Sequence, residues 1–427
     1  MAPLPAYDDA LGAALSAVRA TLGPDGRLGT RRQPLVLAAG SSLAEEIRAD
    51  RDLPPFDRVT MDGFAVRASD VKPGVALPMT GSISAGQAPG SALGPGTCIG
   101  VATGCPLPTG ADAVVPHELT TSEGGRVTFS GPPVAPFDNV HRRAADARRG
   151  EVLLREGERL APDRLAIAAA VGAHQPLIRE GVPSVRILSS GDEIRPAATP
   201  AAELPPHHIR DSNLHALATL APYLGARVES TRHVPDDLES TREAVRNGLR
   251  SADVLVTIGG VSAGPRDHFP SAFDACGVTT IIRGVNLQPG KPILIGVAGV
   301  GGDQSAGSAR SIVLALPGNP ASVMVTAHLF LWPVIRLLSG LDAALPWEER
   351  SLSEPAQPNP RRESFRPASG GVGAGTRVIP WSGSGDFVHL RHADGLVRLP
   401  AQEQPTPAGS PVPFLPWAWN CAGSADR

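Results

Sequence analysis

The stretch VLVTIGGVSAGPRD, residues 254–267, sets a continuous apolar run against a glycine-rich turn that ends in a carboxylate. Three further apolar runs share this character, at residues 185–188, 293–297 and 312–316. Segments with helical spacing alternate with them, near residues 213–224, 237–250, 269–276 and 320–339. Uninterrupted Val/Ile/Leu runs separated by helices are typical of a parallel sheet that is buried on both faces. The sequence therefore predicts a three-layer α/β domain with a parallel-rich sheet at residues 181–342.

The pattern of apolar residues, Gly and Pro changes on either side of this domain. Helical spacing marks residues 7–22, 42–47 and 151–178. The segments that contain them, 1–53 and 140–180, are expected to pack together. Residues 54–139 alternate short apolar bursts with Gly/Pro turns, which predicts a small β domain inserted between those segments. Short strands with abundant Pro and Gly at 343–427 predict a second β domain.

The composition is that of a folded protein. Hydrophobic residues make up 42% of the 427 residues and the formal net charge is −3, which argues against a disordered chain or one that coats nucleic acid. The chain has four cysteines and no CxxC pair, so neither a zinc framework nor a disulfide scaffold is expected. This cysteine usage fits a reducing compartment, and the first residues lack the pattern of a secretory signal. We expect a cytoplasmic protein.

The longest apolar stretch, residues 321–338, has the length of a membrane span. It is interrupted by His328, Pro333 and Arg336. Such interruptions favour a buried helix. We therefore expect no contact with a membrane, and none with nucleic acid.

Polar motifs follow the predicted strands of the α/β domain. In a doubly wound sheet, ligands bind beyond the carboxyl ends of the strands. Glycine-rich turns there, and a helix start capped by Asn319, offer backbone N–H groups to an anion. Lys291 is one of only two lysines beside 37 arginines, which indicates a position where a compact ammonium matters. The motifs are Ser189-Ser-Gly-Asp-Glu193, Gly259-Gly-Val-Ser-Ala-Gly-Pro-Arg-Asp267, Gln288-Pro-Gly-Lys291 and Pro317-Gly-Asn-Pro320.

Four carboxylates are expected beside these motifs, at the carboxyl ends of the strands: Asp192, Glu193, Asp211 and Asp267. Carboxylates beside phosphate-binding turns usually share a divalent cation with the phosphate, which predicts a phosphorylated or nucleotide substrate with Mg²⁺. Taken alone, Asp211-Ser-Asn213 is equally compatible with a cap on the next helix. The sequence has no complete GxxxxGK[ST] loop and no GxSxG elbow, which excludes a Walker NTPase and argues against acyl transfer.

The order of these motifs along the chain resembles that of the molybdopterin molybdenumtransferases, the molybdenum cofactor insertases that also include the E domain of gephyrin. The resemblance covers nearly the whole chain, to about residue 415. Besides the motifs above, it is carried by Met61-Asp-Gly-Phe-Ala-Val66, Ala102-Thr-Gly104, Leu107-Pro-Thr-Gly-Ala-Asp-Ala-Val114, Asp211-Ser-Asn213, Leu316-Pro-Gly-Asn-Pro-Ala-Ser322 and Gly383-Ser-Gly385.

The resemblance implies an elongated homodimer and an enzyme. Each chain would have a discontinuous helical linker domain (1–53 and 140–180), an inserted β domain (54–139), a molybdopterin-binding α/β domain (181–342) and a C-terminal β-barrel domain (343–427). The reaction would convert adenylyl-molybdopterin and molybdate to molybdenum-molybdopterin, with release of AMP in a Mg²⁺-dependent step. The implied protein partners are a molybdopterin adenylyltransferase and the molybdoenzymes that receive the product.

The family's functional positions carry over in three groups. The catalytic group is Asp62, Thr103, Glu193, Asp211 and Asp267, of which Glu193, Asp211 and Asp267 would also bind the metal. The substrate-binding group is Gly259, Gly260, Ser262, Gly264, Asp253, Pro317, Gly318, Asn319 and Pro320. The molybdate group is Lys291, Pro292, Ser322, Arg362 and Ser384. Asp62 and Thr103 lie in the inserted domain and would reach the other subunit's pocket, so that the dimer shares its active sites.

The chain departs from the family pattern at several positions. Arg58-Val-Thr60 stands where Asn-Ser-Ala is usual, and Ala144-Ala-Asp146 where Gly-Glu-Asp is usual. Ile258 replaces a hydroxyl residue, and Gln288 replaces a lysine near the anion site. Two other functions therefore stay open: a carrier or scaffold that binds molybdopterin without turnover, and a molybdopterin adenylyltransferase, which the α/β domain also resembles.

Overall fold

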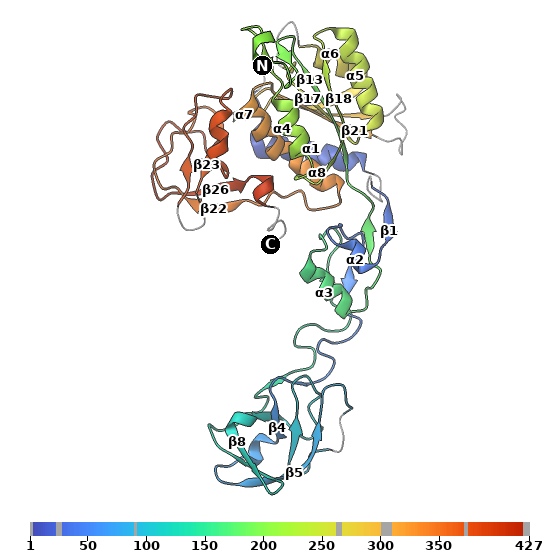
Figure 1. The fold of residues 1–427 in the computed structure, drawn as a ribbon, viewed down its shortest axis with the longest axis vertical. Helices are drawn as coiled ribbons and strands as arrows, with labels where there is room; N and C mark the ends of the chain where they lie inside the picture. Colours follow the sequence, from blue (N-terminus) through green and yellow to red (C-terminus); the bar gives the residue numbers. More distant parts are fainter. Residues whose placement is uncertain are drawn as a thin grey trace.

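The chain folds as an elongated, multidomain α/β protein, seen here in a computed structural model that describes residues 3–22, 28–88, 92–261, 267–299, 310–370 and 375–421. The large α/β sheet and the C-terminal strands lie at one end, and the strands of the inserted β domain lie at the other (Figure 1). Helices α2 and α3 lie between the two ends. The expected multidomain α/β class is confirmed.

The α/β sheet has six strands in the order β16-β13-β17-β21-β20-β18. They are β13 (Ser184–Ser190), β16 (Arg227–Val234), β17 (Val254–Ile258), β18 (Val278–Arg283), β20 (Leu294–Gly299) and β21 (Arg310–Leu316). The first four in this order are parallel, but β20 runs antiparallel to both of its neighbours. The expectation of a parallel strand at 293–297 was therefore wrong. The ten residues that join β18 to β20 contain only the two-residue β19 (Leu287–Gln288), and so short a connection favours an antiparallel partner.

Helices cover both faces of this sheet. They are α4 (Asn213–Leu220), α5 (Leu238–Ser251), α6 (His268–Ala275), and a continuous run of α7 (Pro320–Thr326), a π-helical turn (Ala327–Leu331) and α8 (Trp332–Leu338). Side chains alternate between the faces, so Val254 and Val256 join one buried cluster and Leu255 joins the other. The run from Pro320 to Leu338 is long and apolar enough to cross a membrane, but 83% of its most apolar 18-residue window is buried inside the protein. It is the buried helix that the sequence predicted.

Helix α1 (Tyr7–Thr21) belongs to the core of the α/β domain, which differs from its expected place in the linker. Its buried face joins the cluster that contains Leu329 and Ile335, and the Tyr7 hydroxyl donates to the Leu329 carbonyl at 3.3 Å. Because α1 is amphipathic, it covers whichever apolar surface the tertiary fold presents. The sequence therefore predicts the apolar face of α1 but not the surface against which that face packs.

The linker between the two ends contains short strands as well as helices. Antiparallel pairs join β1 (Thr30–Arg32) to β12 (Leu177–Arg179) and β2 (Ile47–Arg48) to β11 (Val152–Leu154). Helices α2 (Leu35–Ala38) and α3 (Pro162–Ala170) pack beside them. The helix expected at 42–47 is absent there: Ser42 and Leu43 form bridges to Arg159 and Ile178. Pairing with the returning chain therefore overrides the local helical spacing.

The inserted β domain is built on a six-stranded sheet in the order β7-β4-β6-β5-β9-β8. Phe64 and Val66 join one buried cluster and Ala65 joins the other, so the sheet is covered on both faces. The strands are β4 (Gly63–Val66), β5 (Ala76–Ile83), β6 (Cys98–Val101), β7 (Ala113–Pro116), β8 (Thr120–Glu123) and β9 (Arg126–Phe129), with β3 (Arg58–Val59) paired to β10 (Val140–His141) where the chain enters and leaves.

The C-terminal strands pair in the order β19-β23-β25-β26-β22, and β24 pairs with β23. Leu352, which follows β22, forms a bridge to Thr376, which precedes β24. This bridge connects the last strand of the order to β24, so the strand pairing closes into a ring. Because β19 lies between the α/β strands in sequence, its pairing with β23 ties this sheet to the α/β domain. The strands are β22 (Glu348–Ser351), β23 (Glu363–Ser369), β24 (Arg377–Val378), β25 (Gly395–Leu399) and β26 (Pro411–Pro416).

Candidate functional site

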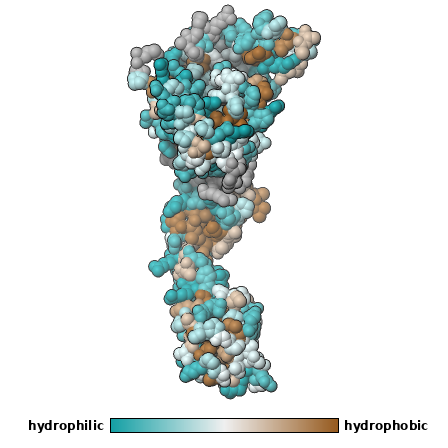
Figure 2. All heavy atoms as spheres, turned by 90° about the vertical axis from the view of Figure 1, so that its left-hand side faces the viewer, coloured by the Kyte–Doolittle hydropathy of each residue, from teal (hydrophilic) through white to brown (hydrophobic). Residues whose placement is uncertain are grey.

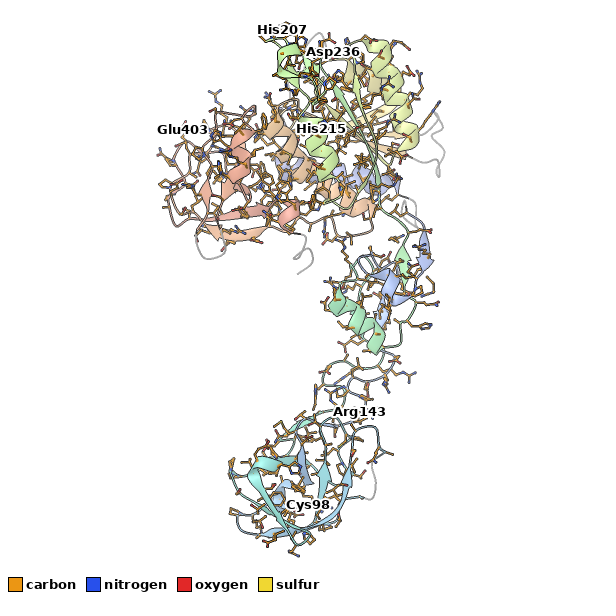
Figure 3. All side chains as sticks on the ribbon, in the orientation of Figure 1. Cys98, Arg143, His207, His215, Asp236 and Glu403 are labelled. Atoms are coloured by element: carbon orange, nitrogen blue, oxygen red, sulfur yellow. The ribbon has the colours of Figure 1, made fainter. Side chains whose placement is uncertain are left out.

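The carboxyl ends of β13, β17 and β21 meet at one edge of the α/β sheet. Ile258, the last residue of β17, lies opposite Ser189 on one side and Leu316 on the other. The Gly259 N–H donates to the Leu316 carbonyl at 3.0 Å, which holds the turn after β17 against the turn after β21. This edge forms the end of the molecule at which His207 and Asp236 lie, whereas Cys98 of the inserted domain lies at the opposite end (Figure 3).

The turn after β17 requires glycine at two predicted substrate-binding positions. Gly259 and Gly260 have φ angles of 78° and 61°, in the left-handed region. A Cβ at Gly260 would stand 2.9 Å from the Phe269 ring, and one at Gly259 would stand 3.2 Å from the Ser190 carbonyl oxygen. The backbone therefore passes closely between β13 and α6. The predicted residues Ser262 and Gly264 lie outside the described residues.

Asp211 is the predicted carboxylate that the structure holds most firmly. Its side chain is 8% exposed. One oxygen, Oδ2, accepts from the Ser189 hydroxyl at 2.6 Å, and the other, Oδ1, accepts from the Leu214 N–H at 3.0 Å. The second bond caps α4, so the capping role that the sequence left open is present. Each oxygen keeps one further lone pair for a ligand at the edge of the sheet.

Two asparagines extend this polar network across the edge. Asn213 Nδ2 donates to the Gly318 carbonyl at 2.6 Å, and Asn319 Nδ2 donates to Ser384 Oγ at 2.7 Å. The Ser384 carbonyl also accepts from the Ala321 N–H at 3.1 Å. The structure thus brings the predicted residues Pro317 to Pro320 together with Ser384 of the C-terminal sheet. Ser322 follows within α7 and is buried.

The other two predicted metal ligands flank this network. Glu193 is exposed on the turn after Gly191, and a Cβ on Gly191 would stand 2.8 Å from Glu193 Oε2, so the carboxylate folds back over that glycine. Asp267 stands at the N-cap position of α6. Within the described residues, no three His, Cys, Asp or Glu side chains form a cluster that could hold a metal ion. Mg²⁺ is usually bound by one or two carboxylates together with substrate phosphates, so it does not require such a cluster beforehand.

Lys291, Pro292 and Arg362 lie at the seam between the α/β domain and the C-terminal sheet. The Lys291 carbonyl accepts from the Val285 N–H at 3.0 Å, and the adjacent Asn286 side chain donates to the Arg361 carbonyl at 3.3 Å. Lys291 is exposed. Since β20 starts beside the end of β21, this seam opens at the same edge as the turn that contains Asn319.

Asp62 and Thr103 form a separate pair in the inserted domain. Asp62 Oδ1 accepts from the Thr103 N–H at 2.6 Å and from its hydroxyl at 2.8 Å. These two bonds lower the pKa of Asp62 below its usual range. Strand β4, which follows Asp62 directly, lies at the opposite end of the molecule from β13 and β17 (Figure 1). Within one chain, the pair is therefore not brought to the carboxyl edge.

Asp253 is also placed away from the other predicted residues. It precedes β17 at the amino edge of the sheet, where its Oδ2 accepts from the Ser184 N–H at 2.8 Å and from the Ser184 hydroxyl at 2.6 Å. This arrangement ties together the starts of β13 and β17. Its geometry is that of a structural residue, although the sequence predicted a role in substrate binding.

The structure adds three polar residues to which the sequence analysis assigned no role: Ser189, Asn213 and His233. The nitrogen Nδ1 of His233 lies 3.2 Å from Ser189 Oγ. Asn213 was visible in its motif, but its partner Gly318 is 105 residues away. His233 has no sequence signal, because only the parallel pairing of β13 with β16 places it beside Ser189.

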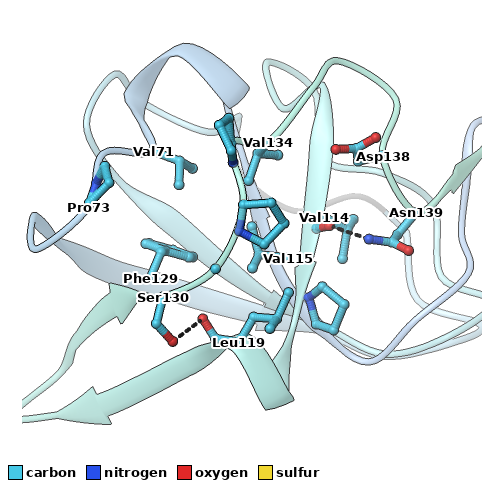
Figure 4. Close-up of a pocket in the computed structure, with 14 residues that line it drawn as sticks. Val71, Pro73, Val114, Val115, Leu119, Phe129, Ser130, Val134, Asp138 and Asn139 are labelled. Atoms are coloured by element: carbon cyan, nitrogen blue, oxygen red, sulfur yellow. Dashed lines mark hydrogen bonds between the residues drawn. The ribbon is translucent and has the colours of Figure 1, made fainter.

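A cavity of about 370 Å³ lies elsewhere, in the inserted domain between β7, β9 and the loop that follows β9 (Figure 4). Its walls are mainly valine, proline, leucine and phenylalanine. The Ser130 hydroxyl and the Asn139 amide at its margin donate to the backbone carbonyls of Leu119 and Val114. It contains no residue of the predicted catalytic, substrate or molybdate groups.

Comparisons with known proteins match both halves of the chain. Residues 6–172 match the MoeA N-terminal region (domain I and II), and residues 186–337 match a probable molybdopterin binding domain. The chain is 36% identical to a molybdopterin molybdenumtransferase of Synechococcus elongatus over 72% of this chain and 75% of that protein. It is 32% identical to molybdopterin molybdenumtransferase 2 of Mycobacterium tuberculosis, over 88% and 92% of the two chains.

Solved structures extend the comparison to the whole fold. A molybdopterin biosynthesis MoeA protein of Pyrococcus horikoshii superposes with a TM-score of 0.69 at 28% identity, covering 97% of this chain and 99% of that chain. The extent of the sequence match and the motifs gathered at the carboxyl edge lead to one conclusion. The chain belongs to the molybdopterin molybdenumtransferase family.

Proposed function

We propose that this protein is a transferase of molybdenum cofactor biosynthesis that inserts molybdenum into molybdopterin. Its substrates are adenylyl-molybdopterin and molybdate, and its products are molybdenum-molybdopterin and AMP. The observation that carries the proposal is the convergence at one sheet edge of the helix-capping carboxylate Asp211, the two turns that follow β17 and β21, and the seam that contains Lys291. Membership of the molybdopterin molybdenumtransferase family supports this proposal.

The site residues suit two anions that must be held side by side. The backbone N–H groups of Gly260, Gly318 and Asn319, in the turns that follow β17 and β21, would face the diphosphate of the adenylylated substrate. Lys291, Arg362 and the Ser384 hydroxyl would hold molybdate at the seam, because cationic and hydroxyl donors pair with an oxyanion. Positioning the two reactants together removes most of the entropic cost of their encounter.

The carboxylates Glu193, Asp211 and Asp267 would hold Mg²⁺ jointly with the substrate phosphate. Carboxylate oxygens are the hard ligands that Mg²⁺ prefers, and Asp211 keeps an unshared lone pair on each oxygen. When bound, the cation would neutralise charge on the bond that is cleaved.

We further propose that the protein acts as a homodimer in which the inserted domain completes the site of the other subunit. The Asp62–Thr103 pair is too far from the carboxyl edge of its own chain to act there. An exposed apolar patch supports association: Val36, Leu37 and Ile167 on α2 and α3 are 87%, 66% and 38% exposed, and brown residues gather at the middle of the molecule (Figure 2). Such patches on a soluble surface are typical of interfaces.

Replacing Asp267 tests the proposed chemistry. Asp267→Asn should abolish molybdate-dependent AMP release while leaving the circular dichroism spectrum and unfolding midpoint unchanged. Asp274→Asn, at the exposed far end of the same helix, is the matched control and should keep full activity. Wild-type turnover in Asp267→Asn would remove this residue from the mechanism.

The main alternative is a carrier that binds molybdopterin without turnover. It is favoured by Gln288, which removes a cationic side chain from the turn that leads into Lys291. A carrier would bind adenylyl-molybdopterin tightly in a calorimeter yet release no AMP when molybdate is added. Release of AMP by the wild-type protein eliminates this alternative.

A further inference from the structure

The pairing of β13 with β16 places His233 beside Ser189. The two residues are direct partners in the parallel register. Neighbouring residues show which face they share: Val185 and Ile187, which alternate with Ser189 along β13, join the cluster beneath α4, whereas Val234 joins the cluster on the other face. Ser189 and His233 therefore both point to the face on which Asp211 starts α4.

Three side chains form a short hydrogen-bonded line on this face. Ser189 Oγ lies 2.6 Å from Asp211 Oδ2 and 3.2 Å from His233 Nδ1. Ser189 is 3% exposed and Asp211 is 8% exposed, whereas His233 is exposed at the edge of the sheet. The buried part of the line is thus connected to solvent through the imidazole.

The direction of these bonds follows from counting protons. A serine hydroxyl has one proton, and an ionised carboxylate can only accept. At 2.6 Å the Ser189 proton must lie between Ser189 and Asp211, because two oxygens without a proton would repel each other at that distance. Ser189 Oγ is then left as an acceptor toward His233, so Nδ1 of that imidazole must carry a proton.

We propose that His233 is a positioning residue for Asp211: its Nδ1–H fixes the Ser189 hydroxyl in the rotamer that donates to Oδ2. Without this bond, Ser189 can rotate and Asp211 keeps only the Leu214 N–H as a fixed donor. Residues that orient a metal-binding carboxylate in this way commonly control the affinity of the site for the metal ion. The consequence for catalysis rests on the function proposed above, but the hydrogen-bond direction does not.

Histidine nitrogen resonances test the bond direction independently of any activity. The full-length protein labelled with ¹⁵N-histidine should show His233 with a protonated Nδ1, its resonance being identified by its absence in His233→Asn. Ser189→Ala should shift that resonance, because the acceptor is lost. An unprotonated Nδ1 in the wild type, or a resonance that Ser189→Ala leaves in place, would overturn the proposal.

Metal dependence tests the positioning role. His233→Ala should raise the Mg²⁺ concentration for half-maximal AMP release about fivefold, the order expected for loss of one hydrogen bond. His233→Asn should restore the wild-type value, because its amide can donate from the place of Nδ1. His215→Ala, at an exposed histidine of α4, is the matched control and should behave as wild type (Figure 3).

The outcomes separate the two claims. Unchanged Mg²⁺ dependence in His233→Ala contradicts the positioning role, as does an effect that His233→Asn fails to restore. A wild-type protein that releases no AMP contradicts the proposed function instead, and the nitrogen resonances still decide the direction of the hydrogen bonds.

Discussion

At the scale of single residues, similar carboxylates have different roles because of where the sheet places them. Asp211 and Asp253 both accept from a serine hydroxyl at 2.6 Å. Asp211 lies beyond the carboxyl end of β13, whereas Asp253 lies before the start of β17. Ligands of open α/β sheets bind at the carboxyl ends, so only Asp211 is placed to meet one.

Asp253→Ala should therefore lower stability and leave substrate binding unchanged. The change removes the acceptor of two Ser184 hydrogen bonds, which should lower the free energy of unfolding by about 1–3 kcal/mol. Urea unfolding measures this loss, and the KM for adenylyl-molybdopterin should not move. Adding Ser184→Ala to Asp253→Ala should lower the free energy of unfolding by less than Ser184→Ala lowers it in the wild-type protein, because the two residues share one interaction. A raised KM with unaltered stability would instead assign Asp253 to the substrate.

Ala144 illustrates a residue that fits its backbone poorly. Its φ angle is 60°, in the left-handed region that favours glycine, and its N–H donates to the Pro54 carbonyl at 3.1 Å. Ala144→Gly should raise the free energy of unfolding by about 0.5–1 kcal/mol, because it relieves the Cβ strain at the expense of some unfolded-state entropy. Ala145→Gly, whose φ is not positive, is the control and should destabilise. If urea unfolding shows that Ala144→Gly and Ala145→Gly change the free energy of unfolding equally, the backbone at Ala144 is not strained.

At the scale of elements, residues that are neighbours in sequence were predicted best. Helix α5 was expected at 237–250 and spans Leu238–Ser251, because its apolar spacing and the Asp237 cap are both local signals. The turns of the candidate site were predicted for the same reason. Three features depend on tertiary contacts and could not be predicted from neighbouring residues. They are the direction of β20, the packing of α1 and the contact between Ser189 and His233.

The helical run from Pro320 to Leu338 joins the α/β core to the C-terminal sheet through His328. This side chain is fully buried; its Nδ1 lies 2.8 Å from the Met324 carbonyl, and its Nε2 accepts from the Ala418 N–H at 3.2 Å. An imidazole that accepts at Nε2 is neutral. Burial lowers the pKa of His328 from 6.5 to about 4, although the Met324 bond opposes this.

His328 should make stability depend on pH. Its pKa is lower in the folded than in the unfolded protein, so the unfolded chain binds the extra proton between pH 6.5 and 4. Stability is fully present above pH 6.5 and falls by about 3 kcal/mol as the pH drops through this window. His328→Gln keeps an acceptor for Ala418 but does not titrate, so its urea midpoint should fall less over the same range. An identical loss in both proteins would show that His328 is not the group responsible.

At the scale of the whole molecule, the fold separates two parts of one predicted active site. The carboxyl edge of the α/β sheet lies at one end and the β4 strand that follows Asp62 lies at the other (Figure 1). The C-terminal sheet is fixed to the first end, since Arg398 of β25 pairs with Asp8 of α1 at 2.6 Å. Glu363 of β23, in the same sheet, holds the Arg398 side chain from the other side at 2.6 Å. The inserted domain therefore has to act on a second chain if it takes part in catalysis.

Mixing two inactive variants should restore activity if the site is shared in this way. Asp62→Asn and Lys291→Gln should each be inactive alone. After unfolding and refolding together in equal amounts, random pairing should give about a quarter of wild-type AMP release, because half the dimers are mixed and each has one intact site. Refolding each variant separately before mixing is the control. A refolded mixture no more active than its parts would place the complete site within one chain.

The measurement that tests the central claim most directly is AMP release from adenylyl-molybdopterin by the wild-type protein, with molybdate and Mg²⁺ each added or withheld. We predict release that requires both, with one molybdenum-molybdopterin formed for each AMP. Tight binding of the substrate without release, or release that ignores molybdate, would contradict the assignment of this protein as a molybdenum-inserting enzyme.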